Sequence, residues 1–367
     1  MQFDDELTYH PPDFTATILA AAPDAAFEVA PGDGLVPKAF YASTNYPTYV
    51  KLHGAWQLVE RQRMDAALTL DPASGVLCAT ELRNVRGGQP VVVGNTEDGS
   101  TGVLVYTGGF SQGVSSAEVF GFMSTGPSRE RPLNYRRLAG LVARNRAPHG
   151  KSIWVLGPAV VHSGAREAMS WLITQGYVDV IFGGNAVATH DIEHALYGTA
   201  LGMDVEGMTV AGGHRHHMDA INTVRQAGSI QAAVDSGVIK NGIMYSAVKA
   251  GIPTVLAGSI RDDGPLPEVI TDALEAQEVM RSYTTEATMV VMIATMLHSI
   301  ATGNMLPTFT TRDGVVRPVY TIAVDAAENV LSKLIDRGSH QAIGIVRNAD
   351  DFVVRLVQEL QALEAGA

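Results

Sequence analysis

The chain has 367 residues and a formal net charge of -12 at pH 7. Its length favours about two domains, and hydrophobic and charged fractions of 46% and 17% are typical of a globular protein. An acidic chain without an evident basic patch argues against a nucleic-acid partner. Cys78 is the single cysteine, which excludes a disulfide framework and a multi-thiolate metal site.

The sequence predicts a cytoplasmic protein without a membrane partner. No apolar run is long enough to span a bilayer, and residues 1–6, MQFDDE, are acidic where a signal peptide would be basic.

Residues 1–147 are predicted to form a mainly β domain. Short alternating runs, such as residues 49–52 and 91–93, lie between clusters of Gly, Pro, Asn and Asp, which is typical of strands joined by turns. A helix is expected at residues 135–143, and the domain boundary follows it.

Residues 148–367 are predicted to form an α/β domain, because strands and helices alternate along this part of the chain. That alternation is typical of a mostly parallel sheet wrapped by helices. Helices are expected at residues 166–175 and 349–363. Strands are expected at residues 153–156, 178–182, 237–244, 254–257, 289–294, 319–324 and 343–346.

Polar residues follow the apolar strands of this second domain. In parallel sheets, ligands bind beyond the carboxyl ends of the strands, near the point where the strand order reverses. The sequence therefore predicts one polar crevice, for a nucleotide or a small acid. The residues expected to line it are Asn185, Asp262, Asp263, Thr295, His298, Asp325 and Asn348.

Residues 180–202 allow two interpretations. A strand runs into a glycine pair before Asn185 and continues as a helix, which is a geometry that holds a phosphate or dinucleotide. The same segment spells H-x-x-E-H through His190, Glu193 and His194, a spacing found in one class of zinc peptidases. Because no third ligand is evident, we favour the dinucleotide interpretation, predict no metal, and expect His194 to be structural.

The other polar clusters can each be structural or functional. His214 lies in a histidine-rich segment that fits a solvated helix start or a place in the site. Arg261, Asp262 and Asp263 either form a turn or hold and deprotonate a substrate. Asn45 and Arg129 fit a strand-end turn and a helix start, and are also the polar groups of the β domain most suited to face the crevice.

Several longer motifs resemble one known family. Residues 157–162 (GPAVVH), 184–193 (GNAVATHDIE), 256–267 (LAGSIRDDGPLP) and 295–301 (TMLHSIA) are similar to the archaeal-type ornithine cyclodeaminases. They are also similar to the C-terminal part of the cyanobacterial arginine dihydrolase/ornithine cyclodeaminase. The N-terminal part, with residues 43–48 (STNYPT) and 128–132 (SRERP), resembles the LOR/SDH conserved region.

The resemblance implies a fold and a cofactor. Residues 148–367 would form a Rossmann-like domain akin to deoxyhypusine synthase that holds NAD, and residues 1–147 would serve substrate binding or oligomerisation. No G-x-G-x-x-G fingerprint follows any strand. The positions that the resemblance assigns to NAD are Gly157, Pro158, Gly184, Asn185, Ala186, Thr295, Met296, Leu297, His298, Asp325, Asn348 and Ala349.

The resemblance also implies a reaction, the conversion of L-ornithine to L-proline and ammonia. Hydride is borrowed from Cα by NAD, the δ-amine closes the ring, ammonia leaves and the hydride returns. Such a lyase needs a base and a cationic group for the carboxylate. The expected catalytic residues are Asp262, Asp263, His190 and Asp191, and the expected substrate-binding residues are Arg261, Arg129, Asn45 and His214.

Alternatives remain, because the sequence departs from the family pattern at Ala66, at Ser246-Ala247 and after Asp325. The chain could be an NAD-dependent dehydrogenase or transferase acting on another amino acid or a polyamine. It could also be a non-catalytic NAD-binding module. In each case a homo-oligomer, dimer or tetramer, is expected.

Overall fold

The computed structural model describes residues 8–110, 134–146, 148–162, 164–204, 207–327, 331 and 342–366. The chain divides into two compact units. The first contains Met1–Gly121, Gly303–Val319 and Arg337–Gln341, and the second contains Phe122–Thr302, Tyr320–Asp336 and Ala342–Ala367. The domain boundary expected after residue 147 stays a prediction.

The first unit is mainly β, as the sequence predicts. Its strands form antiparallel sheets in the orders β1-β6-β4-β5 and β3-β2-β7, with a separate β13-β14 hairpin. Alternating apolar residues such as Val50, Leu68 and Val92 form its core, as expected for half-buried strands. The elements are α1 (Thr17–Ala21), β1 (Phe27–Val29), β2 (Thr48–Leu52), β3 (Ala55–Leu58), β4 (Ala67–Leu70), β5 (Leu77–Thr80), η1 (Leu82–Asn84), β6 (Pro90–Val92), β7 (Val103–Val105), β13 (Phe309–Arg312) and β14 (Val315–Pro318).

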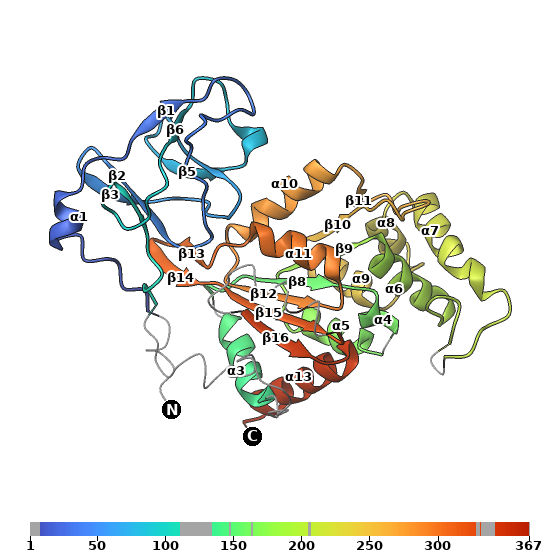
Figure 1. Cartoon of the computed structure of the whole chain (residues 1–367). Helices are drawn as coiled ribbons and strands as arrows, with labels where there is room; N and C mark the ends of the chain where they lie inside the picture. Colours follow the sequence, from blue (N-terminus) through green and yellow to red (C-terminus); the bar gives the residue numbers. More distant parts are fainter. Residues whose placement is uncertain are drawn as a thin grey trace. The chain divides into compact units, whose positions relative to one another are not determined.

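The second unit is built on a seven-stranded parallel sheet with the order β11-β10-β9-β8-β12-β15-β16 (Figure 1). Its interior strands are almost wholly apolar and buried, as expected when helices cover both faces. The strands are β8 (Ser152–Leu156), β9 (Val180–Gly184), β10 (Thr254–Ala257), β11 (Val269–Ile270), β12 (Met289–Ile293), β15 (Tyr320–Asp325) and β16 (Ala342–Val346).

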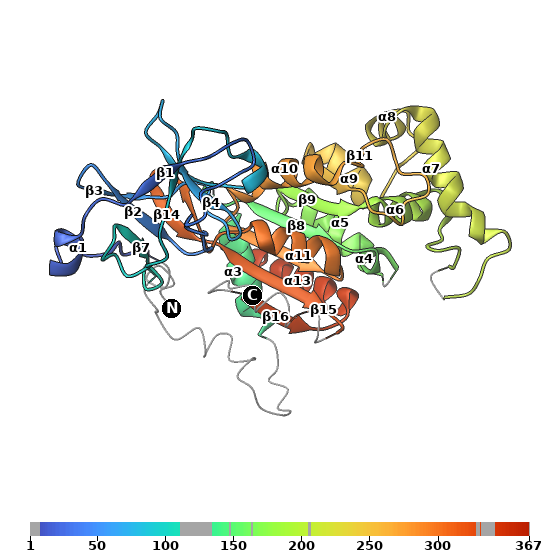
Figure 2. The ribbon, with the colours of Figure 1, turned by 45° about the horizontal axis from the view of Figure 1, so that its top comes forward.

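Helices cover both faces of this sheet. In Figures 1 and 2, α10 and α11 lie on one face, and α3 and α13 pack together on the other. No helix in the described part of the chain combines the length and apolarity that crossing a bilayer requires. The helices are α3 (Tyr135–Asn145), α4 (Ala159–His162), α5 (Arg166–Thr174), α6 (Asn185–Tyr197), η2 (Gly213–Arg215), α7 (His216–Ala227), α8 (Ile230–Asp235), α9 (Ile243–Ala250), α10 (Ala273–Thr284), α11 (Met296–Met305) and α13 (Ala349–Glu364).

One predicted strand is wrong. Residues 237–244 were expected to form a strand, but they make a turn and loop up to Gly242, and α9 begins at Ile243. Gly242 adopts φ 107°, a conformation that interrupts a strand. The donor groups that open α9 bind a side chain from another helix, so the local pattern does not reveal the helix start.

The order of the parallel strands reverses direction at one place. From β8 the chain winds through β9 and β10 to β11, and it then returns to the other side of β8 at β12, continuing to β15 and β16. Leu156 and Ile293 pair across this β8-β12 junction. Ligands of open parallel sheets bind at the carboxyl ends of the strands that flank such a reversal, so the fold directs attention to Gly157 and to the residues after Ile293.

Candidate functional site

The carboxyl edge of the parallel sheet gathers most residues that the sequence assigns to a cofactor. The strand ends are level, because Ala257 pairs with Gly184 and Ile293 pairs with both Leu156 and Val324. Gly157 therefore follows β8 at the same edge where Asn185 follows β9. The other assigned positions at strand ends are Pro158, Ala186, Thr295, Asp325 and Asn348.

Two glycines at this edge are required by close packing. A Cβ on Gly157 would lie 1.9 Å from the carbonyl oxygen of Ala294, across the β8-β12 junction. A Cβ on Gly184 would lie 2.8 Å from Cε1 of His298. Real Cβ atoms do not approach so closely, so these glycines let backbone and ring meet at the strand ends.

The N-terminus of α6 is suited to an anion. Gly184 occupies the N-cap position, and no side chain of the described residues caps the helix. The Asn185 side chain is engaged elsewhere, since its Oδ1 accepts hydrogen bonds from the Leu266 amide at 3.0 Å and from the Thr189 hydroxyl at 3.3 Å. Ala186 is exposed. Uncapped N–H groups and the positive end of the helix dipole favour a phosphate.

His298 adds a buried imidazole to the edge. Its Nδ1 lies 3.2 Å from Oγ1 of Thr295, and burial lowers its pKa, although the Ala257 carbonyl and Asp262 oppose the shift. Nε2 is buried and makes no hydrogen bond of normal geometry within the described residues. The ring is therefore neutral at pH 7 and keeps one polar atom at the edge of the sheet.

Apolar side chains complete this part of the edge. Met296 and Leu297 follow β12 and are 45% and 63% exposed. The exposed apolar pair could pack against a planar ring, and the uncapped start of α6 could bind a phosphate joined to that ring. The residues present therefore fit a dinucleotide such as NAD.

The segment after β10 forms the turn that its sequence suggests. Oδ2 of Asp262 accepts a hydrogen bond from the Ser259 amide at 2.8 Å, and the Arg261 amide donates to Oγ of Ser259 at 3.2 Å. Arg261 and Asp263 are exposed, and Asp262 is near enough to His298 to influence its pKa. The catalytic and substrate-binding roles expected for these residues stay predictions.

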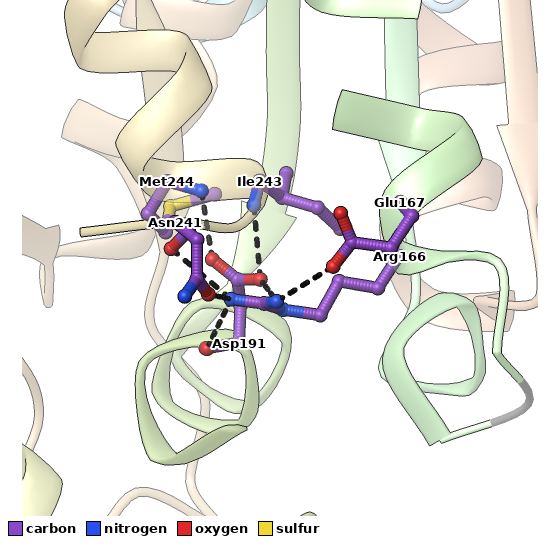
Figure 3. Close-up of polar contacts among 6 residues, drawn as sticks. All are labelled: Arg166, Glu167, Asp191, Asn241, Ile243 and Met244. Carbon is purple, nitrogen blue, oxygen red and sulfur yellow. Dashed lines mark hydrogen bonds and ion pairs between the residues drawn. The ribbon is translucent and has the colours of Figure 1, made fainter. Parts of the chain in front are cut away.

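Asp191 is buried in an ion pair that joins three helices (Figure 3). Its Oδ1 lies 2.7 Å from Nε of Arg166 on α5. The same oxygen accepts from the Ile243 amide at 2.9 Å, and Oδ2 accepts from the Met244 amide at 2.8 Å. Nη2 of Arg166 reaches Oδ1 of Asn241 at 2.7 Å. The carboxylate thus caps the N-terminus of α9.

The contacts with Arg166 and with the first amides of α9 give Asp191 a structural role. Burial raises its pKa, although Arg166 and the two amides oppose the shift. A Cβ on Gly242 would lie 2.0 Å from Nη2 of Arg166, so the glycine makes room for the guanidinium. The catalytic role expected for Asp191 stays a prediction, but its two oxygens already have three donors.

A second buried carboxylate, Glu193, lies on the same helix and binds His190. Nδ1 of His190 and Oε2 of Glu193 are 2.9 Å apart, and the side chains are 10% and 0% exposed. The sequence predicts a site role for His190, whereas Glu193 has a role only in the zinc-peptidase interpretation of H-x-x-E-H. The spacing of three residues on a helix was the signal for this contact.

The zinc interpretation gains no support from this arrangement. In the part of the chain that the structure describes, no three His, Cys, Asp or Glu side chains are placed to hold a metal ion. Nδ1 of His190 is already bound to Glu193, and the ring meets His162 edge-on with centroids 4.8 Å apart.

The remaining expected site residues belong to different parts of the chain. Asn45 is buried in the first unit, where its carbonyl oxygen accepts from the Thr308 amide at 2.8 Å. His214 is exposed in η2, and Arg129 lies outside the described residues. Asn348 is exposed before α13, and Ala349 is buried in its first turn. A cavity of ≈ 590 Å³ lies beside Asn348 at the end of β16.

Two family models match the chain. The model described as "Arginine dihydrolase ArgZ-like, C-terminal, first region" matches residues 47–136, and the one described as "Arginine dihydrolase ArgZ-like, C-terminal, Rossmann fold" matches residues 136–356. The second match agrees with the Rossmann-like fold predicted for the C-terminal domain. An ornithine cyclodeaminase of Methanopyrus kandleri is 46% identical over 341 residues, which cover 92% of this chain and 79% of that protein.

Solved structures are similar as well. A conserved LOR/SDH protein from Methanococcus maripaludis superimposes with a TM-score of 0.83 at 40% identity, covering 93% of this chain and 99% of that one. A ternary complex of AgrE with ornithine and NAD+ gives a TM-score of 0.59 at 38% identity, covering 95% of this chain. The chain spans about half of that longer protein, 47%.

Proposed function

Because the chain belongs to the ArgZ-like C-terminal family and is 46% identical to an archaeal ornithine cyclodeaminase, we propose that it converts L-ornithine to L-proline and ammonia with NAD as cofactor. The observation that carries the proposal is the meeting of Gly157, Gly184, Thr295 and His298 at the strand-order reversal. The proposal is also supported by the solved ternary complex of AgrE, a protein 38% identical to this chain, with ornithine and NAD+.

The residues proposed to hold NAD lie at the carboxyl edge of the sheet. The first turn of α6, with Asn185 and Ala186, would bind the pyrophosphate. The exposed side chains of Met296 and Leu297 would contact a ring. When bound, NAD supplies a group that accepts a hydride from Cα and returns it, so ornithine cation gives proline and ammonium without net oxidation.

Proton transfer falls to the chain's own side chains. A base must remove a proton from a substrate ammonium group, and a cation must hold the substrate carboxylate. We assign the first task to His190, with Asp262 and Asp263 as the acidic groups after β10. The second is assigned to Arg261 and Arg129, while Asn45 and His214 stay predicted substrate contacts.

The experiment is a product balance. We expect the purified protein, incubated with L-ornithine, to release proline and ammonia in equal amounts while no NADH accumulates, and mass spectrometry of the extracted cofactor to give NAD. Net NADH formation with another amino acid would instead identify a dehydrogenase. Bound NAD without turnover of any amine would identify a binding module. The cytoplasmic location and the homo-oligomer stay predictions, and light scattering tests the second.

A further inference from the structure

Each carboxylate oxygen of Glu193 has two hydrogen-bond donors. Oε2 accepts from Nδ1 of His190 at 2.9 Å and from the Leu201 amide at 3.2 Å. Oε1 accepts from the Thr199 hydroxyl at 3.0 Å and from the Gly202 amide at 2.9 Å. Two donors for each oxygen fix the carboxylate in position.

The same contacts keep Glu193 ionised. Burial alone would raise its pKa, but the hydrogen bonds from His190, Gly202 and Thr199 outweigh burial and lower the pKa. A carboxylate can only accept hydrogen bonds, so Nδ1 of His190 must carry the hydrogen between them. Nε2 is then the nitrogen that is left to gain or lose a proton.

The position of His190 connects it with the proposed cofactor site. His190 lies four residues after Ala186, so both are on the same face of α6, separated by about 6 Å along the helix axis. Helix α4, which follows Gly157, brings His162 edge-on to the His190 ring. The hydrogen bond that His190 makes to Glu193 uses Nδ1, so Nε2 is not engaged by that carboxylate.

The segment 199–202 supplies the other hydrogen-bond donors to the Glu193 carboxylate. Oγ1 of Thr199 is also 2.8 Å from Nδ1 of His216, and the His216 ring stacks on Tyr197 with centroids 4.5 Å apart. The orientation of Glu193 is therefore determined by the turn that follows α6 and by the first residue of α7.

We propose that Glu193 is a positioning residue that holds His190 in the Nδ1–H tautomer and presents Nε2 as the proton-transfer atom, an assignment that rests on the function proposed above. Nε2 takes one proton from a substrate ammonium group, and the Glu193 carboxylate stabilises the imidazolium that results. The imidazolium gives the proton to ammonia as it leaves, so His190 ends the cycle as it began.

The central test is Glu193→Gln, which keeps the shape and removes the charge. An amide NH2 facing His190 must donate to Nδ1, which moves the ring hydrogen to Nε2 and removes the base. We expect kcat with ornithine to fall about 100-fold or more, with KM changed by less than about 3-fold and bound NAD unchanged. The matched control is Glu286→Gln, a half-exposed glutamate paired with Lys151, which should keep wild-type kcat.

A spectroscopic readout follows the tautomer itself. Magnetic resonance of protein with 15N-labelled imidazoles, with His190 assigned by its absence in His190→Gln, should show a protonated Nδ1 and a bare Nε2. Glu193→Gln should reverse them. Because Glu193 acts through His190, adding Glu193→Gln to His190→Gln should cause no further loss of kcat.

Three results would overturn either the positioning role of Glu193 or the proposed function. If Glu193→Gln keeps kcat within about 3-fold of wild type and leaves the tautomer unchanged, the positioning role is overturned. If that variant does not fold, His190→Gln decides, since undiminished activity without the imidazole overturns the proposal. If wild-type protein makes no proline from ornithine, the proposed function fails, and the imidazole spectra still decide whether Glu193 sets the tautomer.

Discussion

Asp191 and Glu193 are buried carboxylates two residues apart on α6, and their surroundings differ completely. At 100° per residue the two side chains leave opposite sides of the helix. Asp191 meets the guanidinium of Arg166 and the first amides of α9. Glu193 meets an imidazole and the turn that ends the helix.

The difference between the two partners separates a structural role from a chemical one. The guanidinium of Arg166 has only donors and no acceptor, so its pair with Asp191 offers no atom for proton transfer and joins helices α5, α6 and α9. His190 has two ring nitrogens, so its pair with Glu193 through Nδ1 leaves Nε2 for chemistry. Changes at Asp191 should therefore lower stability, and changes at Glu193 should lower turnover.

The largest effect on stability is expected for Asp191→Ala. It leaves Arg166 buried without its partner and the first amides of α9 uncapped, so the free energy of unfolding should fall by about 3–5 kcal/mol. Urea denaturation measures this loss, and Glu167→Gln, on the exposed side of Arg166 with a 78% exposed side chain, should cost less than about 0.5 kcal/mol. Adding Arg166→Met should return part of the loss, because the buried charge is gone.

A catalytic role for Asp191 would make Asp191→Ala behave like Glu193→Gln. A folded Asp191→Ala variant with unchanged unfolding free energy and a kcat reduced about 100-fold would place Asp191 in the chemistry. In that case the ion pair with Arg166 would be a means of orienting a catalytic carboxylate, and the two buried groups of α6 would share one role.

The fold of the second unit and the polar edge of its sheet follow from local signals in the sequence. Apolar runs that end in glycine or a polar residue identify β8, β9 and β12, and they place Asn185 and Thr295 at one edge because parallel strands end together. The helix at Ile243 was missed because Asp191, which caps it, lies 52 residues away in the sequence. Sequence spacing cannot reveal a partner so distant. The contact between His190 and Glu193 could have been predicted, because residues three apart on a helix are neighbours.

A smaller effect is expected for Thr199→Val. The change removes one of the two donors to Oε1 of Glu193 and the contact with His216, while the Gly202 amide remains. We expect a loss of about 1 kcal/mol in unfolding free energy and a kcat lowered less than about 10-fold. Thr174→Val is the control, because the Thr174 hydroxyl donates only to the Trp171 carbonyl at the surface. A decrease in kcat as large as that of Glu193→Gln would assign the orientation of His190 to Thr199.

The smallest effect concerns the pH dependence of stability at Glu193. Because the pKa of Glu193 is lowered from its usual value of 4.5, its carboxylate contributes stability above pH 4.5, and this contribution is lost as the pH falls through the lowered value. The unfolding free energies of wild type and Glu193→Gln should therefore differ most at pH 7 and converge below pH 4.5. Urea denaturation of both proteins along this range measures the difference, with Glu286→Gln as the control. A difference that stays constant down to the acid transition would mean that the pKa of Glu193 is the same in the folded and the unfolded protein, and that its hydrogen bonds do not favour the carboxylate.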